Sequence, residues 1–238
     1  MCTECGCSST DHSHHHEHES RTIRVEEDLL AKNNRLAAGN RQLFTSSQLL
    51  VVNLVSSPGS GKTSLLERTL ADLKRRFNFS VLEGDQQTTN DADRIAATGV
   101  PVKQINTGAG CHLDAHMVGH GVECFDLVET DILMIENVGN LVCPAAFDLG
   151  EDHKVTVLSV TEGEDKPLKY PQMFQASDLI LINKIDLLPY LDFDLEQCKA
   201  FAQQVNPRIQ IIELSCRSGD GMQQWYDWLS QKTHQKRK

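Results

Sequence analysis

One short segment has the residue types and the spacing that bind phosphate groups. Ser56 to Thr63 reads SSPGSGKT and follows the pattern G-x-x-x-x-G-K-[ST] except at its first position, where Ser56 replaces glycine. In such a loop the backbone N–H groups surround phosphate oxygens, Lys62 reaches the β- and γ-phosphates, and Thr63 binds Mg²⁺. The alternative is a turn without a ligand. We expect a nucleotide to be bound by Pro58, Gly59, Ser60, Gly61, Lys62, Thr63 and Ser64.

A second segment predicts which base is bound. Asn183 to Asp186 reads NKID. The Asp186 carboxylate can accept both the ring N–H and the exocyclic amine of guanine, a pair that adenine lacks, while Asn183 can donate to acceptors of the purine. An ordinary strand-ending turn is the alternative. The phosphate loop and the later SCRSG favour guanine, and the predicted base-binding residues are Asn183, Lys184, Asp186, Ser215, Cys216 and Arg217.

Two further segments are expected near the γ-phosphate. Asp85, in EGDQQTTNDADRI, follows a predicted strand and is expected to reach Mg²⁺ directly or through water. In ENVGN, Glu136 stands where GTPases usually carry Asp in D-x-x-G, and Gly139 can offer an N–H to the γ-phosphate, which predicts a switch segment. No arginine or glutamine stands out as positioning water, so we expect slow intrinsic hydrolysis unless a partner or a dimer completes the site. The predicted catalytic residues are Lys62, Thr63, Asp85, Glu136 and Gly139.

Cysteine and histidine side chains indicate a metal site beside this switch. Cys111 and His112 are expected at the start of a helix, with His116 and His120 following at steps of four. Thiolate and imidazole ligands suit Zn²⁺ and, in other geometries, Ni²⁺, although a histidine row alone is usually a solvated helix face. If the strands that carry these loops are neighbours, Cys111, His112 and Cys143 converge beside the nucleotide, with His116 as an additional candidate. Metal bound there would pull on the segment that senses the γ-phosphate.

The amino-terminal residues offer a second set of metal ligands. Cys2, Cys5 and Cys7 lie within reach of the chain's amine, and nitrogen with thiolates favours the planar environment that Ni²⁺ accepts. The histidines between His12 and His18 are less specific and suit a low-affinity store. A disordered tail with incidental cysteines is the alternative. Burial or loop positions are expected for the remaining cysteines, Cys124, Cys198 and Cys216.

Composition limits the classes of partner and location. The chain has 238 residues, 23 Lys and Arg against 33 Asp and Glu, and a net charge of −10. This charge gives no electrostatic reason to expect nucleic acid as a partner. No apolar run reaches the ~20 residues that span a bilayer, and the first residues do not resemble a signal peptide. We therefore expect no membrane association and a cytoplasmic protein whose eight cysteines stay reduced.

Alternating short apolar runs and amphipathic segments predict an α/β fold. We expect a flexible Cys- and His-rich metal-binding arm over residues 1–20 and one phosphate-loop domain over 21–238, entered by a helix whose apolar positions are Val25, Leu29, Leu36 and Leu43. Helices follow at 66–77, 195–205 and 221–231. A mostly parallel seven-stranded sheet with helices on both faces is predicted from strands near 49–55, 80–83, 102–105, 131–135, 155–160, 179–182 and 209–214.

These motifs resemble those of the HypB-type nickel-incorporation GTPases over essentially the whole chain. CTECGC is similar to the family's amino-terminal nickel motif, and EGEDKPLKYPQMF is a stretch typical of the family. The resemblance implies a GTPase of the SIMIBI type that uses GTP and Mg²⁺, binds Ni²⁺ or Zn²⁺ at Cys111, His112 and Cys143, and helps to insert nickel into [NiFe]-hydrogenase. It also implies partnership with a HypA-type accessory protein and the hydrogenase large subunit precursor, and a nucleotide-dependent homodimer with contacts at Leu187 and Leu191.

Three alternatives remain open at this point. A nickel buffer would use the arm for storage and leave GTP hydrolysis vestigial. A urease-maturation GTPase shares the fold but typically has a Cys-Pro-His motif, whereas this chain has Ala145 after Cys143 and Pro144. A nucleotide kinase also carries a phosphate loop but has no need of the NKID segment.

Overall fold

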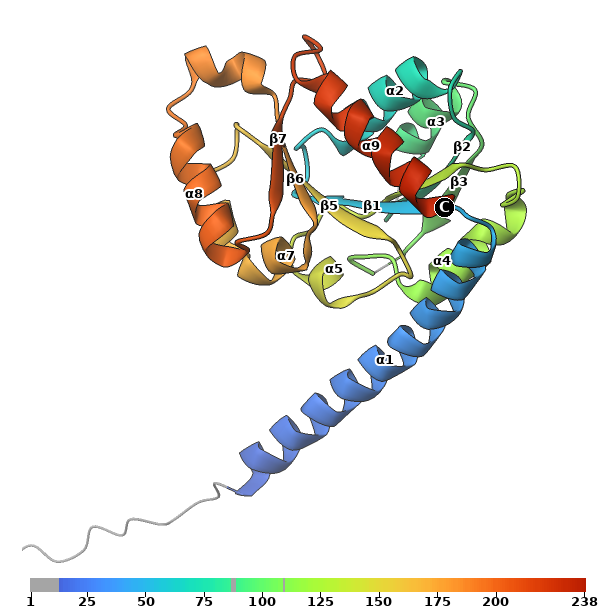
Figure 1. Ribbon diagram of the computed structural model, residues 1–238. Coiled ribbons are helices and arrows are strands. Elements are labelled where there is room, and N and C mark those ends of the chain that lie inside the picture. Colours follow the sequence, from blue (N-terminus) through green and yellow to red (C-terminus); the bar gives the residue numbers. More distant parts are fainter. Residues whose placement is uncertain (1–12, 87–88, 109) are drawn as a thin grey trace, which may run out of the picture.

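A computed structural model describes residues 13–86, 89–108 and 110–238 of the chain (Figure 1). The predicted ligands Cys2, Cys5 and Cys7 lie outside these residues. Within the described part, a sheet of seven parallel strands forms the centre of the molecule, in the spatial order β3-β2-β4-β1-β5-β6-β7. The strands are β1 Leu50–Ser56, β2 Phe79–Asp85, β3 Val102–Asn106, β4 Ile132–Glu136, β5 His153–Ser159, β6 Leu179–Asn183 and β7 Gln210–Glu213.

The predicted seven-stranded parallel sheet is therefore confirmed. Its central strands are buried almost throughout, which explains why their sequences are nearly continuous apolar runs rather than alternating ones. Because all strands run in the same direction, their carboxyl ends lie at one edge of the sheet. The loops that carry the predicted phosphate, base and metal ligands all follow these ends, so the topology brings them together.

Helices cover both faces of the sheet (Figure 1). Helices α2, α3 and α9 pack on one face through a single apolar cluster, and the end of α1 with α4, α7 and α8 packs on the other. None of the helices built from the described residues has the length and apolar composition to span a bilayer. The helices are α1 Ser13–Ser46, α2 Lys62–Leu73, α3 Asn90–Ala96, α4 Ala115–Gly121, α5 Cys143–Ala146, α6 Lys166–Lys169, α7 Pro171–Ala176, α8 Leu195–Val205 and α9 Met222–Lys236, with short 3₁₀ turns η1 Val122–Cys124 and η2 Ile185–Tyr190.

Helix α1 projects from the body of the molecule, and its carboxyl-terminal part packs against that body (Figure 1). The expected apolar face is wrong here, because Leu29 is 57% and Leu43 is 43% exposed. The buried positions are Asn33, Ala37, Asn40 and Phe44. The asparagines donate and accept hydrogen bonds with the backbone of neighbouring loops, and apolar periodicity cannot detect such contacts.

Replacing the single large apolar anchor of this helix tests the corrected face. Phe44 is fully buried against β1 and β4, so Phe44→Ala is expected to lower the free energy of unfolding by about 3–5 kcal/mol. Leu43→Ala, on the neighbouring exposed side, is the matched control and should cost less than about 1 kcal/mol. Urea unfolding followed by circular dichroism measures both; equal losses would contradict the assignment of the buried face.

Candidate nucleotide and metal site

The phosphate loop connects β1 to α2 and requires glycine at two positions. Gly59 and Gly61 have φ angles of 76° and 100°, in the left-handed region that other residues rarely adopt. A Cβ on Gly61 would also lie 2.5 Å from the side-chain nitrogen of Asn183. The loop therefore folds into a tight turn whose backbone closely approaches the base-binding loop.

Ser56, the departure from the usual pattern, anchors the phosphate-binding lysine. Its hydroxyl accepts a hydrogen bond from Lys62 Nζ at 2.7 Å and donates to the carbonyl of Ser57 at 2.6 Å. Burial lowers the pKa of Lys62, while the carboxylate of Glu136 opposes this shift. A glycine at this position has no side-chain oxygen to accept a hydrogen bond from the ammonium group. The serine thus keeps Lys62 in place beneath the loop.

Buried carboxylates lie directly behind the phosphate loop. Thr63 Oγ1 donates to Glu136 Oε1 at 2.8 Å, and Glu83 stands opposite Glu136 on the neighbouring strand. One oxygen of each glutamate is buried without a hydrogen-bond partner. Burial raises the pKa of Glu83 to about 8 and that of Glu136 to about 7. Unpartnered carboxylate oxygens beside a threonine hydroxyl suit a hard cation such as Mg²⁺.

Glu83 is a site residue that sequence analysis missed. It precedes the predicted ligand Asp85 by two positions, so both side chains lie on the same face of β2. The sequence feature that could have revealed Glu83 is a carboxylate inside an otherwise apolar strand. Such a carboxylate is not specific to binding sites, because it also occurs where it pairs with a cation. Arg94 was missed as well: it lines the phosphate cavity, and its guanidinium forms ion pairs with Glu67 and Asp91.

The predicted base-binding residues line one cavity of about 570 Å³. The Asp186 carboxylate is held in place, because its Oδ1 accepts a hydrogen bond from Ser215 Oγ at 2.6 Å. Lys184 adopts a left-handed backbone conformation, φ 65°, and its Nζ donates to the carbonyl of Gly59 at 2.7 Å. The lining residues are Gly61, Ser64, Glu67, Arg68, Asn183, Lys184, Asp186, Leu187, Ser215, Cys216 and Arg217.

The sequence predicts a contact between Asn183 and the base, whereas in this structure the side chain of Asn183 connects loops. Its Nδ2 donates to the carbonyl of Ser60 at 3.0 Å, and its Oδ1 accepts from the backbone N–H groups of Lys184 and Cys216. One side chain thereby joins the phosphate loop to both base-binding loops. Such bonds follow from three-dimensional proximity and are not visible in the four-residue motif.

The phosphate cavity continues from the base cavity. It has a volume of about 540 Å³ and shares Gly61, Ser64 and Lys184 with the base cavity. Its other lining residues include Pro58, Gly59, Lys62, Thr63, Asp85, Glu136 and Gly139. Through these shared residues the two cavities join into one groove.

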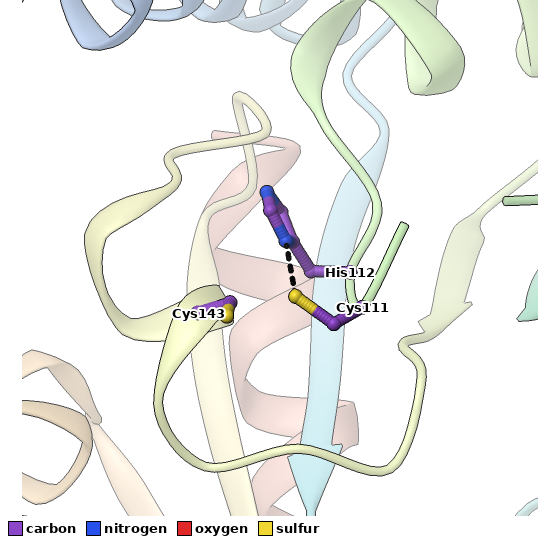
Figure 2. Close-up of side chains that lie close together, drawn as sticks. All are labelled: Cys111, His112 and Cys143. Carbon is purple, nitrogen blue, oxygen red and sulfur yellow. Dashed lines mark hydrogen bonds between the residues drawn. The ribbon is translucent and has the colours of Figure 1, made fainter. Parts of the chain in front are cut away.

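Cys111, His112 and Cys143 come together at the same edge of the sheet (Figure 2). Their candidate ligand atoms all lie within 4.8 Å of one another, and Cys111 Sγ is 3.4 Å from His112 Nδ1. Two ligands of one tetrahedral zinc or nickel ion, each about 2.3 Å from it, would be roughly 3.8 Å apart. The three side chains thus fit a soft metal ion, and burial lowers the pKa of His112, which favours the neutral imidazole that metals bind.

This cluster forms although its strands are not neighbours. The loop with Cys111 follows β3 and the loop with Cys143 follows β4, and β2 lies between these two strands. The first loop crosses the end of β2 at Gly84, where a Cβ would lie 2.7 Å from Leu113 Cγ. The backbone N–H of Leu113 then donates to Oδ1 of Asn137, the residue that directly follows β4 in the chain. A missing side chain on β2 therefore allows the two metal-bearing loops to meet.

Other cysteines and histidines do not join this cluster among the described residues. Helix α4 begins at Ala115, after an N-cap formed by Asp114, so the expectation that Cys111 and His112 start the helix is wrong. His116 is exposed, and its ring packs against that of His120 with centroids 4.7 Å apart. The remaining described cysteines are Cys124, which is exposed, Cys198, which is buried, and Cys216, which lines the base cavity.

Residues 136–140 lie between the phosphate loop and the metal cluster. Glu136 accepts from Thr63, and Gly139 packs against Pro58 so closely that a Cβ would lie 3.1 Å from Pro58 Cα. Asn137 holds the metal-bearing loop through Leu113. The segment that sequence analysis predicts as a switch is therefore in contact with both sites.

Comparison with known proteins identifies the relatives of this fold and site. The model of the nucleotide-binding domain of the CobW/HypB/UreG family matches residues 50–213. The hydrogenase maturation factor HypB of Azotobacter vinelandii is 64% identical over 213 residues, which are 90% of this chain and 70% of the relative. The crystal structure of HypB from Helicobacter pylori in complex with nickel superposes with a TM-score of 0.82 at 41% identity, over 86% of this chain and 96% of that one.

A more distant likeness concerns the fold alone. The signal recognition particle receptor FtsY of Elizabethkingia anophelis has 15% sequence identity and a TM-score of 0.53, and the match covers 83% of this chain and 73% of that one. This similarity supports the predicted α/β fold with a parallel sheet.

The buried glutamates predict a pH dependence of stability in the nucleotide- and metal-free protein. The pKa of Glu83 rises from 4.5 to about 8 on folding, so the folded state keeps a proton that the unfolded state releases above pH 4.5. The contribution of Glu83 to the free energy of unfolding is therefore fully present below pH 4.5 and is lost as the pH rises to about 8. Urea unfolding between pH 5 and 8 should show a steeper decline for the unmodified protein than for Glu83→Gln. Parallel curves would refute the assignment of a protonated Glu83.

Proposed function

The chain belongs to the HypB hydrogenase maturation factors of the CobW/HypB/UreG family, and on this basis we propose that GTP hydrolysis in its groove controls nickel held by Cys111, His112 and Cys143. As a family member the chain is a GTPase. The observation that carries the proposal is the position of residues 136–140. This segment contacts the phosphate loop through Glu136 and Gly139 and leads directly to the metal ligand Cys143.

We propose a role in nucleotide binding for each part of the groove. We assign the guanine to Asp186, held in place by Ser215, with Lys184, Cys216 and Arg217 around it. The phosphates are assigned to the backbone N–H groups of residues 58–64 and to Lys62. Asn183 keeps the two parts of the groove in register. The residues proposed to surround the γ-phosphate are Lys62, Thr63, Asp85, Glu136 and Gly139.

Mg²⁺ fits the donor set behind the phosphate loop. Thr63, Asp85 and Glu136 would hold it, and it would neutralise the charge that develops on the phosphates. The protonation of Glu83 limits the negative charge in this buried cluster when the site has no ligand. Lys62 adds a positive charge beside these carboxylates. Intrinsic turnover is expected to be slow, as the sequence predicts.

Nickel is the metal that we assign to the cluster of Cys111, His112 and Cys143. The H. pylori relative was crystallised in complex with nickel, and two thiols with one imidazole form a soft donor set. Zn²⁺ accepts the same ligands and is the competing ion. The hydrogen bond between Cys111 and Cys143 raises the pKa of the Cys111 thiol, so metal binding must displace a proton from it.

The remaining expectations concern partners and the amino-terminal residues. We propose that a HypA-type accessory protein and the hydrogenase large subunit precursor accept the nickel. Leu187 and Leu191 follow the base motif; Leu191 is 39% exposed and is available for the proposed dimer contact. Nickel storage by Cys2, Cys5 and Cys7 is likewise part of this proposal.

The affinity for nickel in two nucleotide states tests the proposed function. The chain is prepared with Cys2, Cys5 and Cys7 replaced by serine, so that the amino-terminal thiolates no longer contribute to nickel binding through sulfur. Nickel affinity, followed by the sulfur-to-nickel charge-transfer band, should differ at least tenfold between the complex with a non-hydrolysable GTP analogue and the complex with GDP. A complete transfer, from 99% to 1% occupancy, needs about a 10⁴-fold difference. Equal affinities would refute control of nickel by the nucleotide.

The base assignment has its own test at Asp186. Asp186→Asn replaces an acceptor of two N–H groups by an amide that pairs with xanthine, which carries a carbonyl where guanine has an amine. GTP affinity should fall by about 10²–10⁴-fold, and XTP affinity should rise. Isothermal titration with both nucleotides measures this. Asp220→Asn, near the same loop but outside the cavity lining, is the control; retained GTP affinity in Asp186→Asn would contradict the assignment.

A further inference from the structure

Two asparagines of α1 are buried where an amphipathic helix usually buries apolar side chains. Asn33 Oδ1 accepts from the N–H of Ala115 at 2.9 Å, and its Nδ2 donates to the carbonyl of Asp148 at 2.8 Å. Asn40 Nδ2 donates to the carbonyls of Ala115 at 2.8 Å and Leu149 at 3.0 Å. Each amide therefore links the same two loops. Because an unpaired buried amide is destabilising, these bonds fix the separation of the loops.

Both linked loops carry ligands of the metal cluster. Ala115 ends the segment that contains Cys111 and His112, while Asp148 and Leu149 end the segment that begins with Cys143. Arg41 of α1 adds an ion pair with Asp148 at 2.6 Å. The far ends of the two metal-bearing segments are thus joined to one helix.

Close backbone contacts hold α1 firmly against these segments. Gly150 has φ 90°, and a Cβ on it would lie 2.7 Å from the carbonyl oxygen of Ala37 and 2.7 Å from Asn40 Cβ. A Cβ on Gly119 would lie 3.0 Å from Asn40 Oδ1. The fully buried ring of Phe44 anchors the same end of the helix in the apolar core. Tight packing of this kind leaves no room for α1 to shift relative to the sheet.

A third asparagine links the near ends of the same two segments. Asn140 Nδ2 donates to the carbonyl of Cys111 at 3.3 Å, and its Oδ1 accepts from the N–H of Val142 at 2.8 Å. Val142 is the N-cap of α5, which begins at Cys143. Asn140 belongs to the predicted switch segment and follows Gly139, which packs on the phosphate loop.

We propose that two supports hold the metal cluster: α1, through Asn33 and Asn40, is the fixed one, and Asn140 transmits the nucleotide state to the metal ligands. The proposal rests on the nickel site proposed above. A shift of Gly139 and Asn140 on loss of the γ-phosphate moves the near ends of the two segments, while their far ends stay on α1. The distance between the Cys111 and Cys143 sulfur atoms then changes, and metal–thiolate bonds tolerate little change in length.

The two supports predict different effects of the same chemical substitution. Asn→Asp keeps the acceptor oxygen and replaces the donating nitrogen. Asn33→Asp therefore loses its bond to the Asp148 carbonyl, and Asn40→Asp loses its bonds to the carbonyls of both Ala115 and Leu149. Both variants should weaken nickel binding by about tenfold or more in both nucleotide states and leave the ratio of the two affinities unchanged. Asn140→Asp loses its bond to the Cys111 carbonyl, and the ratio should fall toward one.

The experiment uses the full chain with Cys2, Cys5 and Cys7 replaced by serine, and Ni²⁺ as the probe. Affinities are measured by the charge-transfer band with a non-hydrolysable GTP analogue and with GDP. Asn34→Asp, on the exposed side of α1, and Asn78→Asp, an exposed asparagine before β2 at the opposite edge of the sheet, are matched controls that should behave like the reference. Asn33→Asp is the milder α1 variant because its bond to Asp148 is only partly buried, so it remains informative if Asn40→Asp does not fold.

Two results would overturn the proposal. If the ratio of nickel affinities in the two nucleotide states is the same in Asn140→Asp as in the reference protein, Asn140 does not transmit the nucleotide state. If Asn33→Asp binds nickel as tightly as the reference protein does, α1 does not support the cluster. A reference protein that binds nickel equally in both nucleotide states would refute the proposed function and the role of Asn140 together. Asn33→Asp would still decide the role of α1 in that case, so the failures of the two proposals are distinguishable.

Discussion

The hydrogen bond from Thr63 to Glu136 joins the phosphate loop to the end of β4, and the arrangement of the site depends on this link. The residues that follow Glu136 pack on Pro58 and then lead to Cys143. Because the interior here is densely packed, the segment has few positions available, and a displacement at one end must appear at the other. The phosphate loop and the cluster of Cys111, His112 and Cys143 are therefore connected by one short stretch of chain.

Much of this architecture could be predicted from local patterns. The strands are buried on both faces, so they appear as short apolar runs, and the phosphate loop combines a fixed spacing with glycines that the backbone requires. The base motif follows β6 and the switch segment follows β4, where parallel topology places ligand-binding loops. Cys111, His112 and Cys143, which the sequence analysis groups together, also lie close to one another in the structure.

Hydrogen bonds between a side chain and a backbone group far away in the chain could not be predicted from the sequence. The buried face of α1 presents Asn33 and Asn40, whose partners lie 75 or more residues away along the chain. The metal cluster also forms for another reason than adjacent strands, because the missing side chain of Gly84 lets a loop cross β2. Asn183 connects loops through the same kind of long-range bond. Single-sequence periodicity reports which residues are apolar and cannot report which carbonyl a buried amide will meet.

Hydrogen–deuterium exchange tests most directly whether the two sites share residues 136–140. Nickel is added to nucleotide-free protein whose Cys2, Cys5 and Cys7 are serine, and exchange is compared peptide by peptide. We expect slower exchange in peptides that contain the metal ligands and also in the phosphate loop around residues 57–63, which contains no ligand of nickel. Slower exchange confined to the segments with Cys111, His112 and Cys143 would contradict a shared role of residues 136–140.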